Sequence, residues 1–289
     1  MYDLFLAPFV EFDFMRRALV GTLALALSGA PIGVFLILRR MSLTGDAMAH
    51  AILPGAAIGY LFAGLSLGAM TAGGLIAGFV VALASGAVAR FTALREDASL
   101  AAFYLISLAL GVTIVSLRGS NVDLLHVLFG SVLALDDATF VLLAIIASLT
   151  LIGLAALYRP LVMETIDPSF LNSVRPHAGG VAQVLFLALV VLNLVGGFHA
   201  LGTLLAVGLM MLPAASARLW ARDMTAMLGL SVLFALLASY LGLVASYQTG
   251  VPTGPMIILA AGALYFISLV FGRSSGLMRL WRREQHLEG

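Results

Sequence analysis

Residues 42–64 read SLTGDAMAHAILPGAAIGYLFAG, an apolar stretch that contains a carboxylate and an imidazole. Its length suits a membrane-spanning helix, which needs about 20 residues. An ionisable residue at the centre of such a helix costs roughly 2.5–3.5 kcal/mol. Asp46 and His50 are four residues apart and therefore lie on one helix face. Pro54 has no N–H, so the carbonyl of residue 50 loses its helical partner. This turn therefore predicts a divalent-cation site built from a carboxylate, an imidazole and a backbone oxygen.

Small residues recur at every fourth position of the same stretch: Ala47, Ala51, Gly55, Gly59 and Ala63. Such spacing lets the backbone of a neighbouring helix approach closely. Pro54 predicts a kink beside this stripe, and Pro213 releases a carbonyl in a later apolar stretch. Irregular backbone at membrane depth is tolerated where protein or a water-filled path surrounds it. We therefore expect both prolines to lie in packed helices.

The composition predicts that most of the chain lies in lipid. Hydrophobic residues make up 62% of the 289 residues, charged residues 10%, and the mean hydropathy is +1.11. Apolar stretches of about twenty residues, each long enough to span a bilayer, occur near 16–38, 47–65, 67–89, 99–117, 138–157, 179–197, 200–219, 224–246 and 255–272. These stretches predict an all-α polytopic membrane protein of about nine transmembrane helices in a single domain, 1–289. Residues 1–15 are expected to form an interfacial N-terminal segment.

Several function classes are excluded by residues that the chain lacks. Cysteine is absent, which excludes disulfides and thiolate metal sites. All 15 basic residues are arginine, and a P-loop needs a lysine, so ATP hydrolysis by that route requires another subunit. The arginines lie at the ends of spans and form no patch for nucleic acid. No HExxH sequence occurs, which argues against an intramembrane metallohydrolase.

The distribution of arginine predicts the orientation, because arginine concentrates on the cytoplasmic side of a membrane. With a cytoplasmic C-terminus, twelve arginines face the cytoplasm: Arg39, Arg40, Arg90, Arg95, Arg159, Arg175, Arg218, Arg222, Arg273, Arg279, Arg282 and Arg283. The N-terminus is then outside, and residues 273–289 form a cytoplasmic tail. Residues 118–137 lie outside as a re-entrant or interfacial helix. Residues 158–178 lie inside, where Asp167 and Pro168 are expected to start a short amphipathic helix.

Four stretches resemble the signatures of one family. They are RRMSLTGDAMAHAILPG at 39–55, VDLLHVLFGSVLAL at 122–135, LGTLLAVGLMMLPAASAR at 201–218 and VPTGPMIIL at 251–259. The chain resembles the permease subunits of bacterial zinc/manganese/iron ABC importers, whose fold is that of a type II importer. The resemblance implies a multi-pass permease of the inner membrane that forms a homodimer. It also implies ATPase subunits on the cytoplasmic face and a metal-binding protein that delivers cargo from outside.

The resemblance also assigns roles to residues. It places Asp46 and His50 on the metal pathway. It makes 158–178 the segment that couples the permease to the ATPase, with Glu164, Asp167, Pro168 and Phe170 as the contact residues. The family usually has an acidic residue where this chain has Ser131. Secondary candidates for metal binding or docking are therefore Asp123, His126, Asp136, Asp137 and His199.

These candidates also have structural explanations. Asp46 could cap the N-terminus of its helix, and Asp136 and Asp137 could cap the span that follows them. His50 could be a packing residue. The sequence favours Zn²⁺ as the transported ion, with Mn²⁺ or Fe²⁺ as alternatives, and predicts no permanently bound cofactor and no enzymatic activity in this subunit. An ion-driven secondary metal carrier is the alternative from another class, and a purely structural membrane subunit is a further one.

Overall fold

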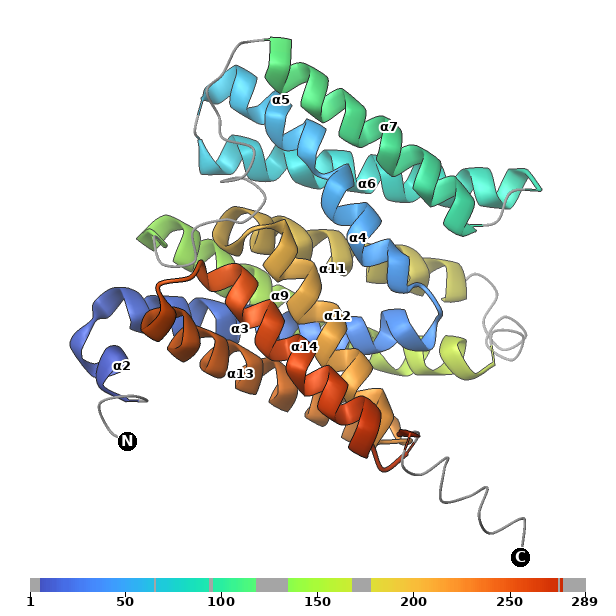
Figure 1. Ribbon diagram of the computed structural model, residues 1–289. Helices are drawn as coiled ribbons and strands as arrows, with labels where there is room; N and C mark the ends of the chain where they lie inside the picture. The colour runs from blue at the N-terminus through green and yellow to red at the C-terminus, as the bar shows by residue number, and fades with distance from the viewer. Residues whose placement is uncertain are drawn as a thin grey trace, which may run out of the picture.

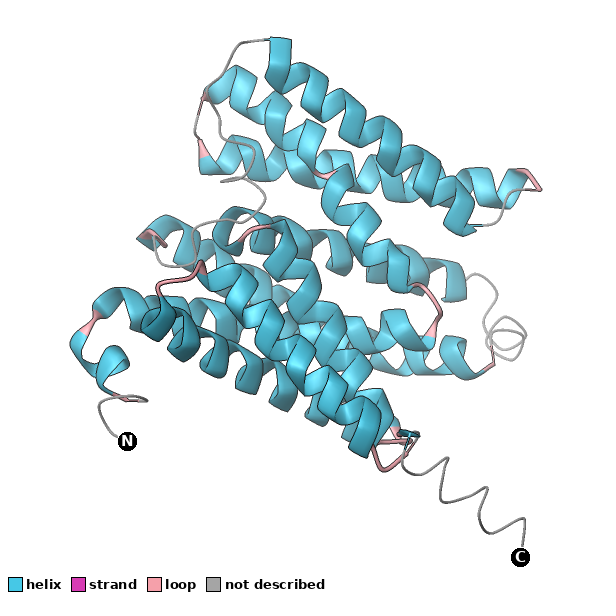
Figure 2. Cartoon of the chain, in the orientation of Figure 1, coloured by secondary structure: helices cyan, strands magenta, loops and turns pink. Residues whose placement is uncertain are grey.

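The computed structural model describes residues 6–64, 66–93, 96–117, 135–167, 178–274 and 276–277, and every regular element in these ranges is a helix (Figure 2). The prediction of an all-α membrane protein is confirmed. The helices are α2 (Ala7–Glu11), α3 (Asp13–Leu38), α4 (Ser42–Ala51), α5 (Leu53–Ala63), α6 (Leu67–Phe91), α7 (Glu96–Leu117), α9 (Asp137–Ile166), α11 (Ala178–Leu201), α12 (Thr203–Trp220), α13 (Met224–Thr249) and α14 (Thr253–Phe271).

Among the described residues, eight helices are long and apolar enough to cross a membrane, with α4 and α5 taken together as one span. The ninth expected span corresponds to α7, whose apolar part, Ala98–Ile114, is shorter. Each predicted apolar stretch therefore matches a helix. The expected boundary at 197–200 was wrong, because α11 continues to Leu201 and the chain turns at Gly202, where φ is 90°. Such a positive φ favours glycine.

Two further expected boundaries differ from the structure. The interfacial segment 1–15 overlaps the membrane helix, since α3 already begins at Asp13. The segment 158–178 was expected to lie beyond the membrane helix, but α9 runs on to Ile166 with Pro160 inside it. Leu161 is fully buried there, and its carbonyl accepts a hydrogen bond from Thr165 Oγ1 at 2.7 Å. These contacts continue the helix past the proline.

The helices form two groups that are joined by the second span (Figure 1). One group contains α5, α6 and α7, and the other contains α3, α9, α11, α12, α13 and α14. Helix α4 crosses between them, because it contacts α6 and α7 on one side and α3, α11 and α12 on the other. Helix α6 also packs against α11.

The second span is broken at Ile52, two residues before Pro54, where α4 ends and α5 begins. Ser107 Oγ on α7 donates a 3.0 Å hydrogen bond to the carbonyl of Ala51 beside the break. A side-chain hydroxyl thus satisfies a backbone group that an irregular helix leaves exposed within the membrane.

The small residues of α5 allow α6 to approach at backbone distance. A Cβ added at Gly55 would lie 2.0 Å from the carbonyl oxygen of Gly73, and one added at Gly59 would lie 2.4 Å from that of Ala69. Such distances leave no room for any side chain larger than hydrogen. The expected close packing around the small-residue stripe therefore occurs against α6.

Helices α3 and α12 meet in the larger group at a similar distance. A Cβ at Gly33 would lie 1.9 Å from the carbonyl oxygen of Met210. Pro213 is buried one turn of α12 further on, and the helix remains continuous through it. Polar contact across the same group is provided by Asn193 Nδ2 of α11, which donates to Ser28 Oγ of α3 at 2.7 Å. This buried bond fixes the register of α11 against α3.

Candidate functional site

Asp46 and His50 lie one turn apart on α4, as their spacing predicts. Asp46 Oδ1 is 3.8 Å from His50 Nε2, which is too long for a hydrogen bond. The N-cap of α4 is Met41, and Asp46 lies inside the helix. The alternative that Asp46 caps this helix is therefore wrong. The Asp46 side chain is 62% exposed and that of His50 is 26% exposed, so both can be reached from the adjacent cavity.

The imidazole of His50 is held by an aromatic ring and not by a hydrogen bond. It stacks on Tyr104 of α7, with ring centroids 6.2 Å apart and an interplanar angle of 29°. Its Nδ1 is buried and has no hydrogen-bond partner within the described part of the chain. Buried polar atoms are normally hydrogen-bonded. The nitrogen that faces Asp46 is the other one, Nε2, so an ion shared by the two side chains would bind there and leave Nδ1 as it is.

A cavity of about 340 Å³ separates this face of α4 from α12. Its lining consists of Asp46, Ala49, His50, Thr203, Leu204, Val207 and Gly208. A water molecule occupies about 30 Å³ in the liquid, so six waters around an ion take up roughly 180 Å³. A hydrated divalent cation therefore fits in the cavity and can exchange some of its water for the two side chains.

The distance between the two side chains suits a shared ion. Metal–oxygen and metal–nitrogen bonds of about 2.1 Å let one ion reach two atoms that are up to about 4.2 Å apart. The 3.8 Å separation of Oδ1 and Nε2 falls within that reach. The described ranges contain no group of three or more His, Cys, Asp or Glu side chains that could hold a metal. Within the described residues, Asp46 and His50 thus provide two ligands to an ion.

The secondary candidates are placed elsewhere or lie outside the description. Asp136 is the N-cap of α9 and accepts a 3.0 Å hydrogen bond from the backbone N–H of Thr139. Hydrogen bonds from the side chain and backbone of Thr139 lower the pKa of Asp136 below its usual value. Asp137 Oδ1 pairs with Arg17 Nη1 at 2.6 Å. Asp123 and His126 lie outside the described residues, as does the side chain of His199.

The coupling candidates are described only in part. Asp167 follows the last residue of α9, and its backbone N–H bonds to the carbonyl of Met163. Glu164, on the last turn of α9, forms an ion pair with Arg39 at the end of α3. Pro168 and Phe170 lie outside the described residues.

Two residues around these sites were missed from the sequence. Tyr104 lies in an apolar stretch, where a single aromatic residue indicates only packing. Arg39 was interpreted only as an orientation signal at the end of a span. The one clue to its ion pair was an acidic residue, Glu164, in the predicted segment 158–178, and sequence alone does not show that this segment meets the end of the first span.

The chain matches the model of the ABC 3 transport family over residues 11–272. It is 30% identical over 290 residues to the manganese transport system membrane protein MntC of Halalkalibacterium halodurans, covering 98% of this chain and 96% of that protein. It is 31% identical over 259 residues to the manganese import system permease protein ScaB of Streptococcus parasanguinis, covering 89% and 90% of the two chains.

A solved structure has the same fold. A chain of PsaBC from Streptococcus pneumoniae, determined in complex with Fab, superposes with a TM-score of 0.84 at 28% identity and covers 97% of this chain and 99% of that one. The resemblance to metal ABC permeases seen in the sequence is therefore confirmed. Since the family model and the relatives extend over nearly the whole length, the chain belongs to the ABC 3 transport family, as a multi-pass metal permease of the bacterial membrane.

Proposed function

We propose that this chain is the membrane permease through which an ABC importer moves Mn²⁺ into the cytoplasm. The relatives from H. halodurans and S. parasanguinis are both named as manganese transport proteins. We therefore propose Mn²⁺, which the sequence offered as an alternative, as the cargo in place of the Zn²⁺ that the sequence favoured. The chemistry of the site agrees, because the carboxylate of Asp46 suits Mn²⁺, while the imidazole of His50 accepts several divalent ions.

The observation that carries the proposal is the placement of Asp46 and His50 at the edge of one cavity, 3.8 Å apart. The ion is the cargo in this proposal and binds only in passing. Two permeases paired about a two-fold axis would present each residue twice. If the second spans lie near that axis, two carboxylates then offset the two charges of the ion and reduce its desolvation cost. In this proposal the homodimer brings two carboxylates and two imidazoles to one ion.

The energy for transport comes, in this proposal, from a separate ATPase subunit that docks near the end of α9, through 164–174. A metal-binding protein delivers the ion from outside. The orientation proposed is an external N-terminus and a cytoplasmic C-terminus. It is supported by the gathering of arginines at one end of the helices, where Arg218 Nη1 donates to the carbonyl of Ile37 and Arg39 follows α3. At the other end of α3, Arg16 and Arg17 pair with Asp13 and Asp137.

Labelled-Mn²⁺ uptake tests the proposal in a strain that lacks its own metal importers and expresses the permease with its ATPase and binding protein. Asp46→Asn keeps the shape of the side chain and removes its charge, and His50→Ala removes the imidazole. Both variants are expected to reduce uptake to background at normal expression. Asp13→Asn is the matched control, since it neutralises an exposed carboxylate of α3 and is expected to transport normally.

The outcomes separate the competing functions. Unlabelled Mn²⁺ in excess is expected to suppress uptake more strongly than Zn²⁺ does. Full uptake in both Asp46→Asn and His50→Ala would remove this pair from the pathway. Uptake of labelled zinc that excess Mn²⁺ does not inhibit would instead indicate that Zn²⁺ is the transported ion. Uptake that is driven by a proton gradient without ATP would favour a secondary carrier.

A further inference from the structure

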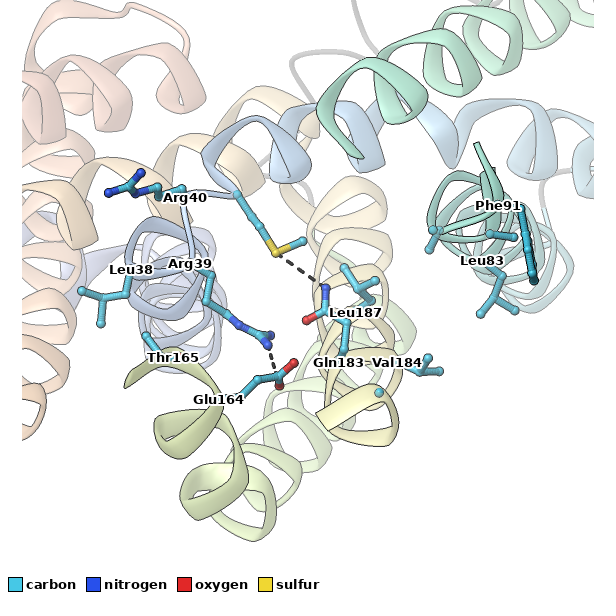
Figure 3. Close-up of a pocket in the computed structure, with 15 residues that line it drawn as sticks. Leu38, Arg39, Arg40, Leu83, Phe91, Glu164, Thr165, Gln183, Val184 and Leu187 are labelled. Carbon is cyan, nitrogen blue, oxygen red and sulfur yellow. Dashed lines mark hydrogen bonds and ion pairs between the residues drawn. The ribbon is translucent and has the colours of Figure 1, made fainter. Parts of the chain in front are cut away.

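A second, larger crevice lies at the arginine-rich end of the helices and shares no lining residue with the cavity beside Asp46. Its volume is about 810 Å³. It opens between the end of α6, the start of α11, the end of α9 and the connection from α3 to α4 (Figure 3). The transport pathway proposed above does not use it.

One corner of the crevice is polar and centred on a buried arginine. The Arg39 side chain is only 8% exposed, and its Nη2 lies 2.5 Å from Glu164 Oε2. Its Cζ also lies 5.5 Å from the centre of the Phe186 ring. Nη1 of Arg39 is buried without a hydrogen-bond partner among the residues that the structure describes. Leaving a buried charged donor unpaired is unfavourable, so an acceptor from outside the chain would stabilise this corner.

Gln183 of α11 shows the same incomplete pairing. Its Nε2 donates to Met41 Sδ at 3.7 Å, and its Oε1 has no partner within the described part of the chain. In Figure 3 the amide of Gln183 and the carboxylate of Glu164 point toward the guanidinium of Arg39. The polar corner therefore contains an unused donor on Arg39, which suits a phosphate oxygen, and an unused acceptor on Gln183, which suits a hydroxyl and not a phosphate.

The opposite wall is apolar and largely exposed. Leu83 is 53% exposed, Phe91 is 83% exposed and Val184 is 45% exposed, and Leu187 completes this wall. The polar corner lies at the level of the helix ends, since Arg39 caps α3, Phe91 ends α6 and Glu164 is two residues from the end of α9. Helix ends of membrane proteins lie near the headgroups. The crevice thus has a polar part at headgroup depth and an apolar part that extends into the bilayer.

We propose that this crevice binds one anionic phospholipid, with its phosphate against Arg39 and one acyl chain along Leu83, Val184 and Leu187. The lining residues that the structure describes carry the charges of Arg39, Arg40 and Glu164, which sum to one positive charge. An anionic headgroup complements that charge, whereas a metal cation is repelled by it. Basic pockets between membrane helices favour anionic lipid headgroups for the same reason. A lipid also fills the apolar part of the crevice, which a free phosphate ion leaves empty.

Filling the crevice tests the proposal directly. Gly86 lines it, and a Cβ at Gly86 would have no heavy atom within 4 Å, so Gly86→Leu places a side chain in the crevice without a clash. Gly262 of α14 is equally free of neighbours and lies outside the lining, which makes Gly262→Leu the matched control. Native mass spectrometry of the full-length chain, titrated with phosphatidylglycerol, measures the affinity of the most tightly bound lipid.

We expect Gly86→Leu to weaken that lipid by at least about tenfold, equivalent to about 1.4 kcal/mol, and Gly262→Leu to leave it unchanged. Wild-type affinity in Gly86→Leu would overturn the proposal. Equal weakening in Gly262→Leu would overturn it as well, because the effect would then not come from the crevice.

A second comparison tests recognition of the headgroup. Arg40→Gln removes the net positive charge of the described lining and leaves the ion pair of Arg39 and Glu164 in place. The wild type is expected to retain phosphatidylglycerol over phosphatidylcholine, and Arg40→Gln to lose that preference. Equal retention of both lipids by the wild type would refute an anionic headgroup. Displacement of the lipid by millimolar inorganic phosphate alone would assign the crevice to a small anion and refute the lipid.

Discussion

Replacing Gly55 by alanine adds one methyl group where α5 and α6 meet. The new Cβ would lie 2.0 Å from the carbonyl oxygen of Gly73 and 2.5 Å from its carbonyl carbon. Backbone atoms cannot rotate away, so the helices must separate until the contact reaches about 3.4 Å, the lower limit of ordinary contact. A gap of even 0.5–1 Å forfeits about a quarter to a half of the dispersion energy of each contact.

The expected loss of stability follows from two opposing effects. Overpacking costs about 1–3 kcal/mol, and this backbone clash belongs at the upper end. Alanine is about 1 kcal/mol more favourable than glycine in a helix. We therefore expect Gly55→Ala to reduce the free energy of unfolding by about 2 kcal/mol.

Thermal unfolding of the purified chain in detergent measures this loss. On the scale known for soluble chains of 150–250 residues, 2 kcal/mol lowers Tm by roughly 4–8 °C. Gly229→Ala in α13 is the control, because a Cβ there would have no neighbour within 4 Å. Its Tm is expected to stay the same or rise. Unchanged Tm in Gly55→Ala would refute the close approach of α5 and α6.

Two further predictions follow from the ends of the helices. Hydrogen bonds from Thr139 lower the pKa of Asp136, so the cap of α9 is stabilising above the unfolded pKa of about 3.9 and is lost as the pH falls through the lower, folded value. The hydrogen-exchange rate of the Thr139 amide should therefore rise in that acid range in the wild type. In Asp136→Asn the rate should show no such rise. Identical pH profiles of the exchange rate in the two proteins would contradict the cap. For orientation, a reporter fused after Gly289 is expected to be active in the cytoplasm and one inserted at the exposed Gly250 turn to be active outside, and the reverse pattern would invert the topology.

The fold could be predicted from the sequence because lipid acts on hydrophobicity and length. An apolar stretch of the right length must form a helix in a bilayer, so each expected stretch forms a helix, although the apolar part of α7 is shorter than the others. The boundaries were less predictable. The apolar stretch was expected to end near residue 157, yet α9, with Leu161 fully buried, runs on to Ile166. Such tertiary contacts leave no periodic signal in a sequence.

The candidate site could be predicted only within one helix turn. The spacing of Asp46 and His50 sets their shared face, because helical geometry alone determines it. The partners from other helices could not be predicted in this way. Tyr104 reaches His50 from α7, and Glu164 reaches Arg39 from α9. Contacts between distant segments depend on how helices pack, and a single sequence does not encode them in its local pattern.

The break at Ile52 divides the second span into two short helices connected by a hinge. Helix α5 packs closely against α6 through Gly55 and Gly73, while α4 carries Asp46 and His50 toward α12. The Ser107 hydroxyl stabilises the hinge without making the two helices continuous. If the two helix groups rotate relative to each other, the hinge bends and the width of the cavity beside α12 changes. A permease with such a hinge can lower its affinity for the ion by moving whole helices, with no change of side-chain rotamer.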